Sequence, residues 1–212
     1  MKTIRLLAIV SALGLLGGPV LAVTIDFTNE TPWGGVAGLN DFTASGIRIS
    51  SVGGDMTFND SGGEPAGCAS AGAGLECDGD GIGINDDEVT GNTTEMLILE
   101  FLGLPVNILG VDVLDLFQGE GDEGEFDEAV ELSTDGVLWS SFSSAGNPGG
   151  YLSTGFTAFN TSFLYVRGID DPVSDVALAR IEYEPVPEPT TLALLGIGLT
   201  GLGVRARGRS RR

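Results

Sequence analysis

Acidic and amide side chains gather in one glycine-rich segment, residues 78–88, which reads DGDGIGINDDE. Calcium binds about six to eight oxygen atoms from carboxylates, carbonyls and water, and it tolerates irregular geometry. The segment could therefore hold a calcium ion, with ligands from Asp78, Asp80, Asn85, Asp86 and Asp87. The spacing differs from an EF-hand loop, which would not place Ile82 at its fifth position. A solvated acidic loop without an ion is the favoured interpretation, and the calcium site is the alternative.

Hydrolytic chemistry has weaker support. The chain has no histidine, so a Ser-His-Asp triad is excluded. Asp112 and Asp115 have the residue type that glycosidases use, but that reaction needs a fixed separation between two carboxyl groups and one raised pKa, which sequence spacing does not show. A second acidic run, residues 120–128, is typical of a solvated surface. We predict that the protein is not an enzyme.

Two aromatic side chains in glycine- and proline-rich stretches could stack on sugar rings. Trp33 lies in TPWGG and Tyr151 lies in PGGY. Aromatic rings combine a broad apolar face with, in Trp and Tyr, a polar group. Core packing is the alternative for both residues, and it is the favoured interpretation for Trp139.

The residues between the termini alternate apolar and polar side chains at strand spacing, notably over 95–102, 106–117, 162–169 and 176–183. Asp135-Gly136 predicts a tight hairpin whose second strand turns Val137 and Trp139 toward the core. Residues 59–91 predict a long irregular segment, and a phase slip at Ala179-Arg180 predicts a bulge. No helical period is convincing outside the termini. The fold class is therefore all-β, an antiparallel β-sandwich of jelly-roll-like form.

This predicted domain, residues 23–184, holds three arginines against 29 acidic residues, a net charge of −26. The whole chain carries only −20, because the other seven basic residues lie in the terminal segments. So negative a surface repels nucleic acid and attracts divalent cations. Nucleic-acid binding is therefore excluded as a function.

Residues 1–22 have the parts of a secretory signal peptide. Lys2 and Arg5 precede an apolar run over residues 6–16, and cleavage is predicted after Ala22. A retained anchor helix is the alternative, but Gly17-Gly18-Pro19 would interrupt such a helix. The domain is therefore expected outside the cytoplasm.

Cys68 and Cys77 are the only cysteines of the chain. In an exported protein, such a pair in a loop of small residues predicts a disulfide. Two free thiols are the alternative. A zinc site would need further soft ligands, and the sequence supplies none.

Residues 185–212 fall into three blocks. A short signal of Val186, Pro187, Glu188 and Pro189 comes before an apolar, glycine-containing run over residues 192–204. The chain then ends in a basic cluster of Arg205, Arg207, Arg209, Arg211 and Arg212. A membrane span needs about 20 apolar residues, so this run is marginal even with its flanks. The arginines are expected to stay on the cytoplasmic side. A small buried helix with a disordered basic end is the alternative.

These three blocks resemble the PEP-CTERM sorting signal of Gram-negative bacteria, which an exosortase-type membrane peptidase recognises. The resemblance implies a hydrophobic sorting helix, an inner-membrane intermediate, and delivery to the cell surface or to an exopolysaccharide matrix. Separately, the run STDGVLW followed by FLYVR is similar to galactose-binding-like sandwiches of secreted bacterial proteins. That second resemblance supports a fold more than a ligand.

We therefore expect an exported structural or adhesive protein of the surface or matrix, with association tuned by calcium. The alternative function is a small carbohydrate-binding module, calcium-dependent or not. A hydrolase and an ice-binding protein are weaker hypotheses, the latter because regular Thr-x-Thr arrays are missing.

Overall fold

Alternating burial along the strands builds the fold, which a computed structural model describes for residues 21–58, 68, 74–85, 88–91, 94–120, 126–146, 149–169 and 174–187. β6 (Met96–Phe101) and β14 (Phe163–Gly168) bury every second side chain and leave those between them half-buried or exposed. This alternation is expected of a sheet that packs one face on a core. The predicted all-β class with antiparallel sheets is confirmed.

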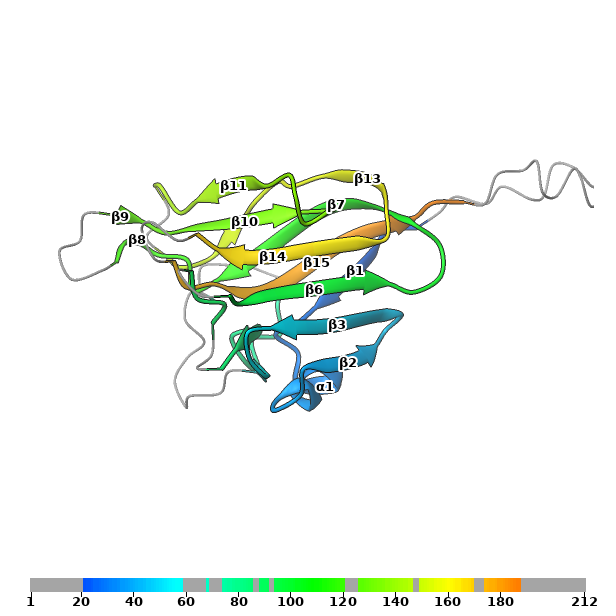
Figure 1. Cartoon of the computed structure of the whole chain (residues 1–212), viewed down its shortest axis with the longest axis horizontal. Helices are drawn as coiled ribbons and strands as arrows, with labels where there is room; N and C mark the ends of the chain where they lie inside the picture. The colour runs from blue at the N-terminus through cyan, green and yellow to red at the C-terminus, as the bar shows by residue number, and fades with distance from the viewer. Residues whose placement is uncertain are drawn as a thin grey trace, which may run out of the picture. The chain divides into compact units, whose positions relative to one another are not determined.

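The first sheet, called sheet B, has the strand order β11-β10-β14-β6-β3-β2. Its other strands are β2 (Asp41–Ala44), β3 (Ile47–Val52), β10 (Ala129–Ser133) and β11 (Ser140–Ser143). Every pairing in sheet B is antiparallel. Figure 1 shows β14 and β6 running side by side, with β10 on one side of them and β3 on the other.

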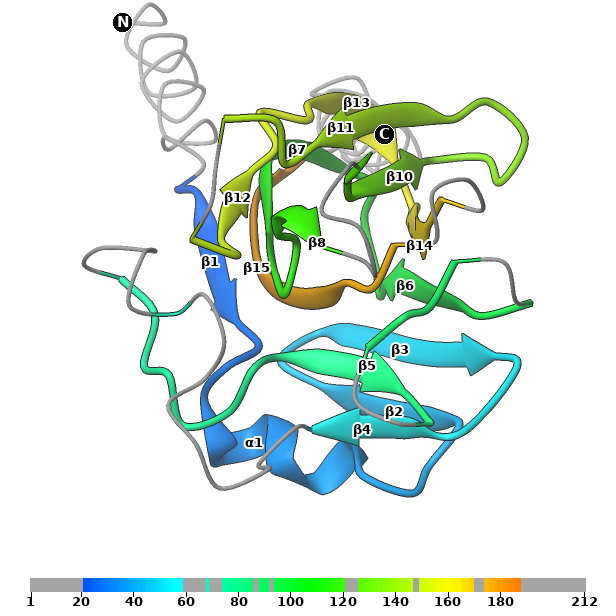
Figure 2. The ribbon, with the colours of Figure 1, turned by 90° about the vertical axis from the view of Figure 1, so that its left-hand side faces the viewer.

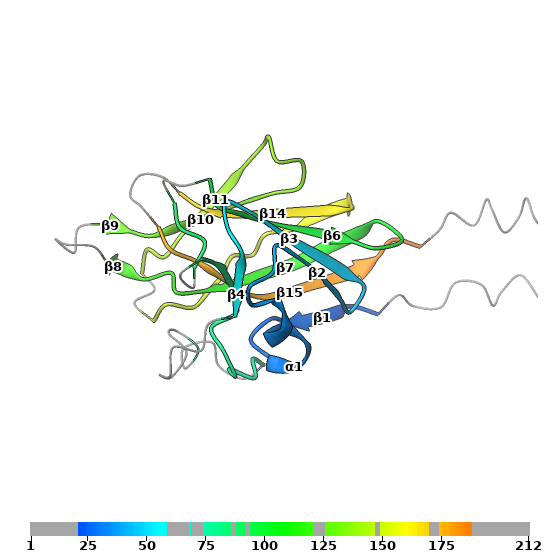
Figure 3. The same ribbon diagram turned by 60° about the horizontal axis from the view of Figure 1, so that its bottom comes forward.

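The second sheet, called sheet A, is centred on the antiparallel pair of β7 (Val106–Leu114) and β15 (Ala177–Pro185). Its shorter strands are β1 (Val23–Asp26), β4 (Met56–Phe58), β5 (Ile82–Ile84), β12 (Leu152–Ser153) and β13 (Ala158–Thr161). The β7–β15 register shifts between Leu178 and Arg180, which confirms the predicted bulge. Figure 3 separates the two layers, with β10, β14 and β6 in one and β7, β15 and β1 in the other.

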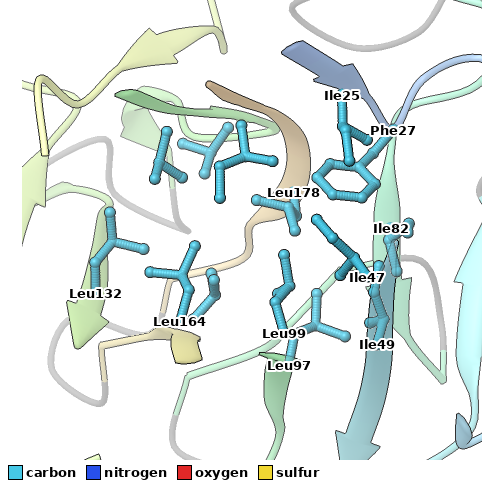
Figure 4. Packing of buried hydrophobic residues seen from close by; sticks show 14 of the residues in the cluster. Ile25, Phe27, Ile47, Ile49, Ile82, Leu97, Leu99, Leu132, Leu164 and Leu178 are labelled. Carbon is cyan, nitrogen blue, oxygen red and sulfur yellow. The ribbon is translucent and has the colours of Figure 1, made fainter. Parts of the chain in front are cut away.

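The main apolar core lies between the two sheets. Sheet B contributes fully buried leucines and isoleucines, among them Ile47, Ile49, Leu97, Leu99, Leu132 and Leu164. Ile25, Ile82 and Leu178 of sheet A belong to the same core cluster. In Figure 4 the labelled side chains of the two sets converge on the space between the ribbons. The burial of these side chains supplies the main driving force for folding.

Short elements close the ends of the sandwich. α1 (Glu30–Trp33) and the 3-10 helix η2 (Gly34–Val36) connect β1 to β2 and place Trp33 and Val36 in the core. β8 (Gln118–Glu120) and β9 (Phe126–Asp127) form a separate hairpin. Figure 2 shows α1 at the same end of the sandwich as β2 and β4. A four-residue helix is too short to display a helical period, so α1 could not be predicted from the residue pattern.

The hairpin between β10 and β11 differs from the predicted tight turn. Leu132 pairs with Ser140, so the connection spans residues 134–139. Val137 and Leu138 are 75% and 76% exposed, and Trp139 is half-buried in this loop. The prediction that Val137 and Trp139 face the core is therefore wrong. The cause is the Asp135 carboxylate, which accepts hydrogen bonds from the Val137 and Leu138 amides at 2.8 Å and folds the chain into a wider loop.

Strand β5 lies within the segment 59–91 that was predicted to be irregular. All three of its residues are buried, and it sits between β4 and β15. A short strand buried on both faces has no polar alternation to reveal it. Because β5 is also surrounded by glycines and aspartates, the sequence pattern did not predict it.

Residues Ala22–Pro185 form one compact unit. Within the residues that the structure describes, no helix is both long enough and apolar enough to cross a membrane. Residues 1–20 of the predicted leader (residues 1–22) lie outside the described residues. Residues 188–212 of the predicted sorting segment (residues 185–212) also lie outside them.

Truncation of the core side chain Leu178 should destabilise the sandwich strongly. Leu178→Ala removes a fully buried side chain that packs against both sheets, and we expect the free energy of unfolding to fall by about 2–5 kcal/mol. Leu109→Ala on β7 is the matched control, because Leu109 is 37% exposed and its truncation should cost far less. Urea denaturation followed by tryptophan fluorescence measures both. Equal effects of the two substitutions would contradict the assigned core.

Candidate functional site

The predicted disulfide between Cys68 and Cys77 is present. The backbone that follows Leu75 is held against the end of β1. The Glu76 amide donates to Asp26 Oδ2 at 2.7 Å, and the Cys77 amide donates to Thr28 Oγ1 at 3.0 Å. Because the crosslink and these hydrogen bonds act on the same short stretch, they fix where the predicted calcium segment begins.

The disulfide covers the face of sheet A that points away from the main core. Cys68 packs with Leu114, Ala177 and Ala179 in a second apolar cluster, joined by Leu75, Cys77 and Tyr151. Along β15, Leu178 points into the main core while its neighbours Ala177 and Ala179 point into this second cluster. The central strands of sheet A are therefore buried on both faces at this point.

A buried ion pair lies beside the second cluster. Arg180 Nε donates to Asp112 Oδ2 at 2.5 Å, and Arg180 Nη2 donates to the Tyr151 hydroxyl at 3.2 Å. The Asp112 side chain is only 5% exposed and that of Arg180 is 27% exposed. Burial raises the pKa of Tyr151, and the nearby Asp112 charge adds to the effect, so the phenol stays neutral at physiological pH. These contacts give Tyr151 a structural role, and sugar stacking by Tyr151 stays a prediction.

The described members of the predicted calcium set do not converge on one point. Asp80 and Asn85 stand beyond opposite ends of β5, an extended strand that rises about 3.3 Å per residue. Asn85 Nδ2 donates to Glu95 Oε1 at 2.5 Å, and Asp78 Oδ2 accepts from the backbone amide of Glu30 at 3.2 Å. Asp80 is buried, with 6% of its surface exposed.

Asp86 and Asp87 lie outside the described residues. Among the residues that are described, no group of three or more acidic or cysteine side chains is arranged to hold a metal ion. Calcium binding by this segment stays a prediction.

The predicted sugar-stacking role of Trp33 is wrong. Trp33 is 1% exposed, and its ring makes edge-on contacts with Phe27 at 4.7 Å and with Phe42 at 6.1 Å between ring centroids. The flanking Pro and Gly residues suggested a surface loop, whereas they form the α1–η2 connection that turns the indole inward. A ring held in this way has no face left for a ligand.

Aromatic side chains that the sequence analysis did not select lie on the outer face of sheet B. Phe163 and Tyr165 alternate along β14 with the core residues Leu164 and Val166, so they point away from the core. Arg167 occupies the next outward position of β14, and its guanidinium carbon lies 4.0 Å from the centre of the Trp139 ring. Trp139 therefore lies on the same outer face. The period of two in FLYVR was the available signal, but apolar residues at both phases of the strand obscured which face was outside.

The first two sorting residues follow directly on the last strand. Val186 and Pro187 come after the end of β15 without regular secondary structure, and Pro187 is exposed. Glu188, Pro189 and the basic residues at 205, 207, 209, 211 and 212 lie outside the described residues. Of the two described signal residues, Val186 is half-buried and Pro187 is accessible.

Residues 185–210 match the PEP-CTERM protein-sorting motif, which confirms the resemblance expected from the three blocks of the tail. The motif directs a protein toward the cell surface by way of the membrane and an exosortase. Neither a curated protein nor a solved structure matches the chain. The likeness of the domain to galactose-binding-like sandwiches stays a prediction.

Loss of the disulfide should lower stability without changing the fold. Replacing both cysteines (Cys68→Ser with Cys77→Ser) releases a short loop, and we expect the free energy of unfolding to fall by about 2–3 kcal/mol. Denaturation curves with and without a reductant measure the effect. The reduced wild type should match the double variant, whose stability should not respond to reductant. A reductant effect that persists in the double variant would contradict this assignment.

Breaking the buried ion pair should cost more than breaking an exposed one. Arg180→Met leaves the Asp112 carboxylate buried without its guanidinium partner, and we expect a loss of about 2–4 kcal/mol at neutral pH. The matched control is Arg48→Met, which breaks the pair of Arg48 with Asp41 on half-exposed side chains and should leave stability nearly unchanged. Thermal and urea unfolding of both variants make the comparison, and a smaller effect for Arg180→Met than for the control would contradict it.

Proposed function

We propose that this protein is exported, processed at its tail by an exosortase-type peptidase, and placed on the cell surface or in an exopolysaccharide matrix, where its sandwich domain acts structurally or adhesively. The observation that carries the proposal is the PEP-CTERM motif over residues 185–210. The apolar run of that motif would hold the chain in the inner membrane while the terminal arginines stay on the cytoplasmic side.

The start of the motif suits a peptidase substrate. A peptidase needs an accessible, extended chain, and β15 ends at Pro185, just before the Val-Pro-Glu-Pro signal. Pro185 still pairs with Val106, whereas the exposed Pro187 lies beyond the last paired residue. Cleavage within the motif would therefore leave every strand of sheet A in place.

The sandwich domain suits an extracellular structural role. A disulfide closes a loop within the segment between β4 and β5, and disulfides persist in oxidising compartments outside the cytoplasm. The domain's charge of −26 favours solubility and opposes close self-association. Calcium bound to the acidic domain would reduce that repulsion, and we propose that calcium tunes the association of the domain in this way.

Carbohydrate binding is a second candidate function. The observation that favours it is the set of aromatic side chains on the outer face of sheet B, since rings on an exposed sheet can stack on sugar rings. This candidate is compatible with the first, because an adhesive matrix protein needs a surface that holds polysaccharide.

Mass spectrometry of the surface-associated protein tests the sorting proposal. We expect the mature form to begin near Val23 and to lack residues 192–212. Substituting Pro187, Glu188 and Pro189 together by alanine should leave the tail attached and the protein in the membrane fraction. Glu182→Ala, an exposed β15 position outside the motif, is the matched control and should be processed like the wild type. Surface protein that still ends at Arg212 would contradict the proposal.

A further inference from the structure

We propose that the outer face of sheet B binds an uncharged polysaccharide chain, and that Phe163, Tyr165 and Trp139 are the residues that stack on its sugar rings. These three residues are called the aromatic row. The inference rests on the proposed function, since it gives the matrix protein its ligand class and its contact surface.

The aromatic row is held in place by β14 and by the β10–β11 loop. Phe163 and Tyr165 are fixed by the core side chain Leu164 between them, and their ring centroids lie 6.2 Å apart. Their planes are inclined by only 32°, whereas the Phe27–Trp33 pair in the core is inclined by 62°. The two rings occupy neighbouring outward positions of β14 and offer adjoining apolar surfaces, which we call the platform.

The β10–β11 loop builds one side of this platform. The Asp135 carboxylate holds the Val137 and Leu138 amides, and these hydrogen bonds lower the pKa of Asp135. Gly136 then passes so close to Tyr165 that a Cβ on it would lie 3.5 Å from the Tyr165 ring. Val137 and Leu138 are left as an exposed apolar pair at the end of the loop. The loop thus adds apolar surface beside the rings.

Polar groups line the aromatic row on both sides. Arg167 Nε donates to Glu131 Oε2 at 2.8 Å on the β10 side. On the β6 and β3 side, Arg48 contacts both Glu100 and Asp41. A sugar ring presents apolar C–H groups on its faces and hydroxyl groups around its edge. Rings below and charged hydrogen-bonding groups beside it therefore match both parts of a sugar.

The charge of this face and of the domain favours an uncharged polysaccharide over an acidic one or a second copy of the chain. The row lies among two arginines and three carboxylates that already pair with one another, so the face offers no surplus positive charge. The domain as a whole carries −26. An acidic polysaccharide and a second copy of the chain would both be repelled, whereas an uncharged chain would not. An open sheet face without an enclosing pocket also suits an extended polymer better than a small molecule.

Affinity electrophoresis of the mature exported protein tests the inference. The gels contain cellulose ether, galactomannan or xyloglucan as uncharged probes, and polygalacturonate as an acidic probe. We expect retardation by at least one uncharged probe, little change with added salt, and no retardation by polygalacturonate. Phe163→Ala combined with Tyr165→Ala should weaken binding about tenfold or more. Phe159→Ala is the matched control, because Phe159 is 77% exposed on β13 of sheet A and should be without effect.

Each other outcome overturns the inference. Phe163→Ala alone is the second variant, since this side chain is 37% exposed and its loss leaves the core unchanged. Binding that survives both variants, or that Phe159→Ala weakens equally, would move the site elsewhere. Retardation by polygalacturonate alone would overturn the uncharged ligand, and no retardation by any probe would overturn sugar binding. A dimer in sedimentation that Phe163→Ala dissociates would make the face a self-association surface. None of these results bears on tail processing, so the sorting proposal is judged separately.

Discussion

The pairing of β7 with β15 is the interaction on which the rest of sheet A depends, because each strand carries neighbours on its other edge. β1 and β5 pair with β15, and β12 and β13 pair with β7. The pair is also covered on both faces, by the main core on one side and by the disulfide cluster on the other. A strand in that position needs small or apolar side chains, or polar ones with partners. Ala177, Ala179 and the Asp112–Arg180 pair meet this requirement.

The same burial explains which parts of the fold the sequence could reveal. β6 and β14, which have one face in the core, were predicted from their six-residue runs rich in apolar side chains, although those runs did not show which face was outside. β5 is buried throughout and has too few residues to show a pattern, so it was missed. The bulge in β15 left a trace, because the extra residue shifts the phase of the alternation at Ala179-Arg180. β7 and β15 are also covered on both faces, but each has nine residues, so their length made them predictable where the three residues of β5 were not.

The candidate site was less predictable, because the direction of each aromatic ring depends on side-chain contacts that a strand or turn pattern does not show. Trp33 was expected in a surface loop, yet Phe27 and Phe42 enclose it. Trp139 was expected in the core, yet the hydrogen bonds of Asp135 hold its loop away from a tight turn and leave the ring beside Arg167. In both cases the sequence identified an aromatic side chain of interest but did not show whether that side chain is buried or lies at the surface. The disulfide was predictable, since two cysteines in an exported chain leave one pairing.

The three arginines of the domain have different environments on the outer faces of the two sheets. Arg180 is largely buried on sheet A, where the disulfide cluster closes the surface above the central strands. Arg48 and Arg167 are half-exposed on sheet B, where Arg48 pairs with two carboxylates and Arg167 with one. Sheet A also ends in the strand that leads into the sorting motif. Cleavage beyond Pro185 would leave the β7–β15 pair intact, so removal of the tail would change neither sheet A nor the outer face of sheet B, on which the proposed binding depends.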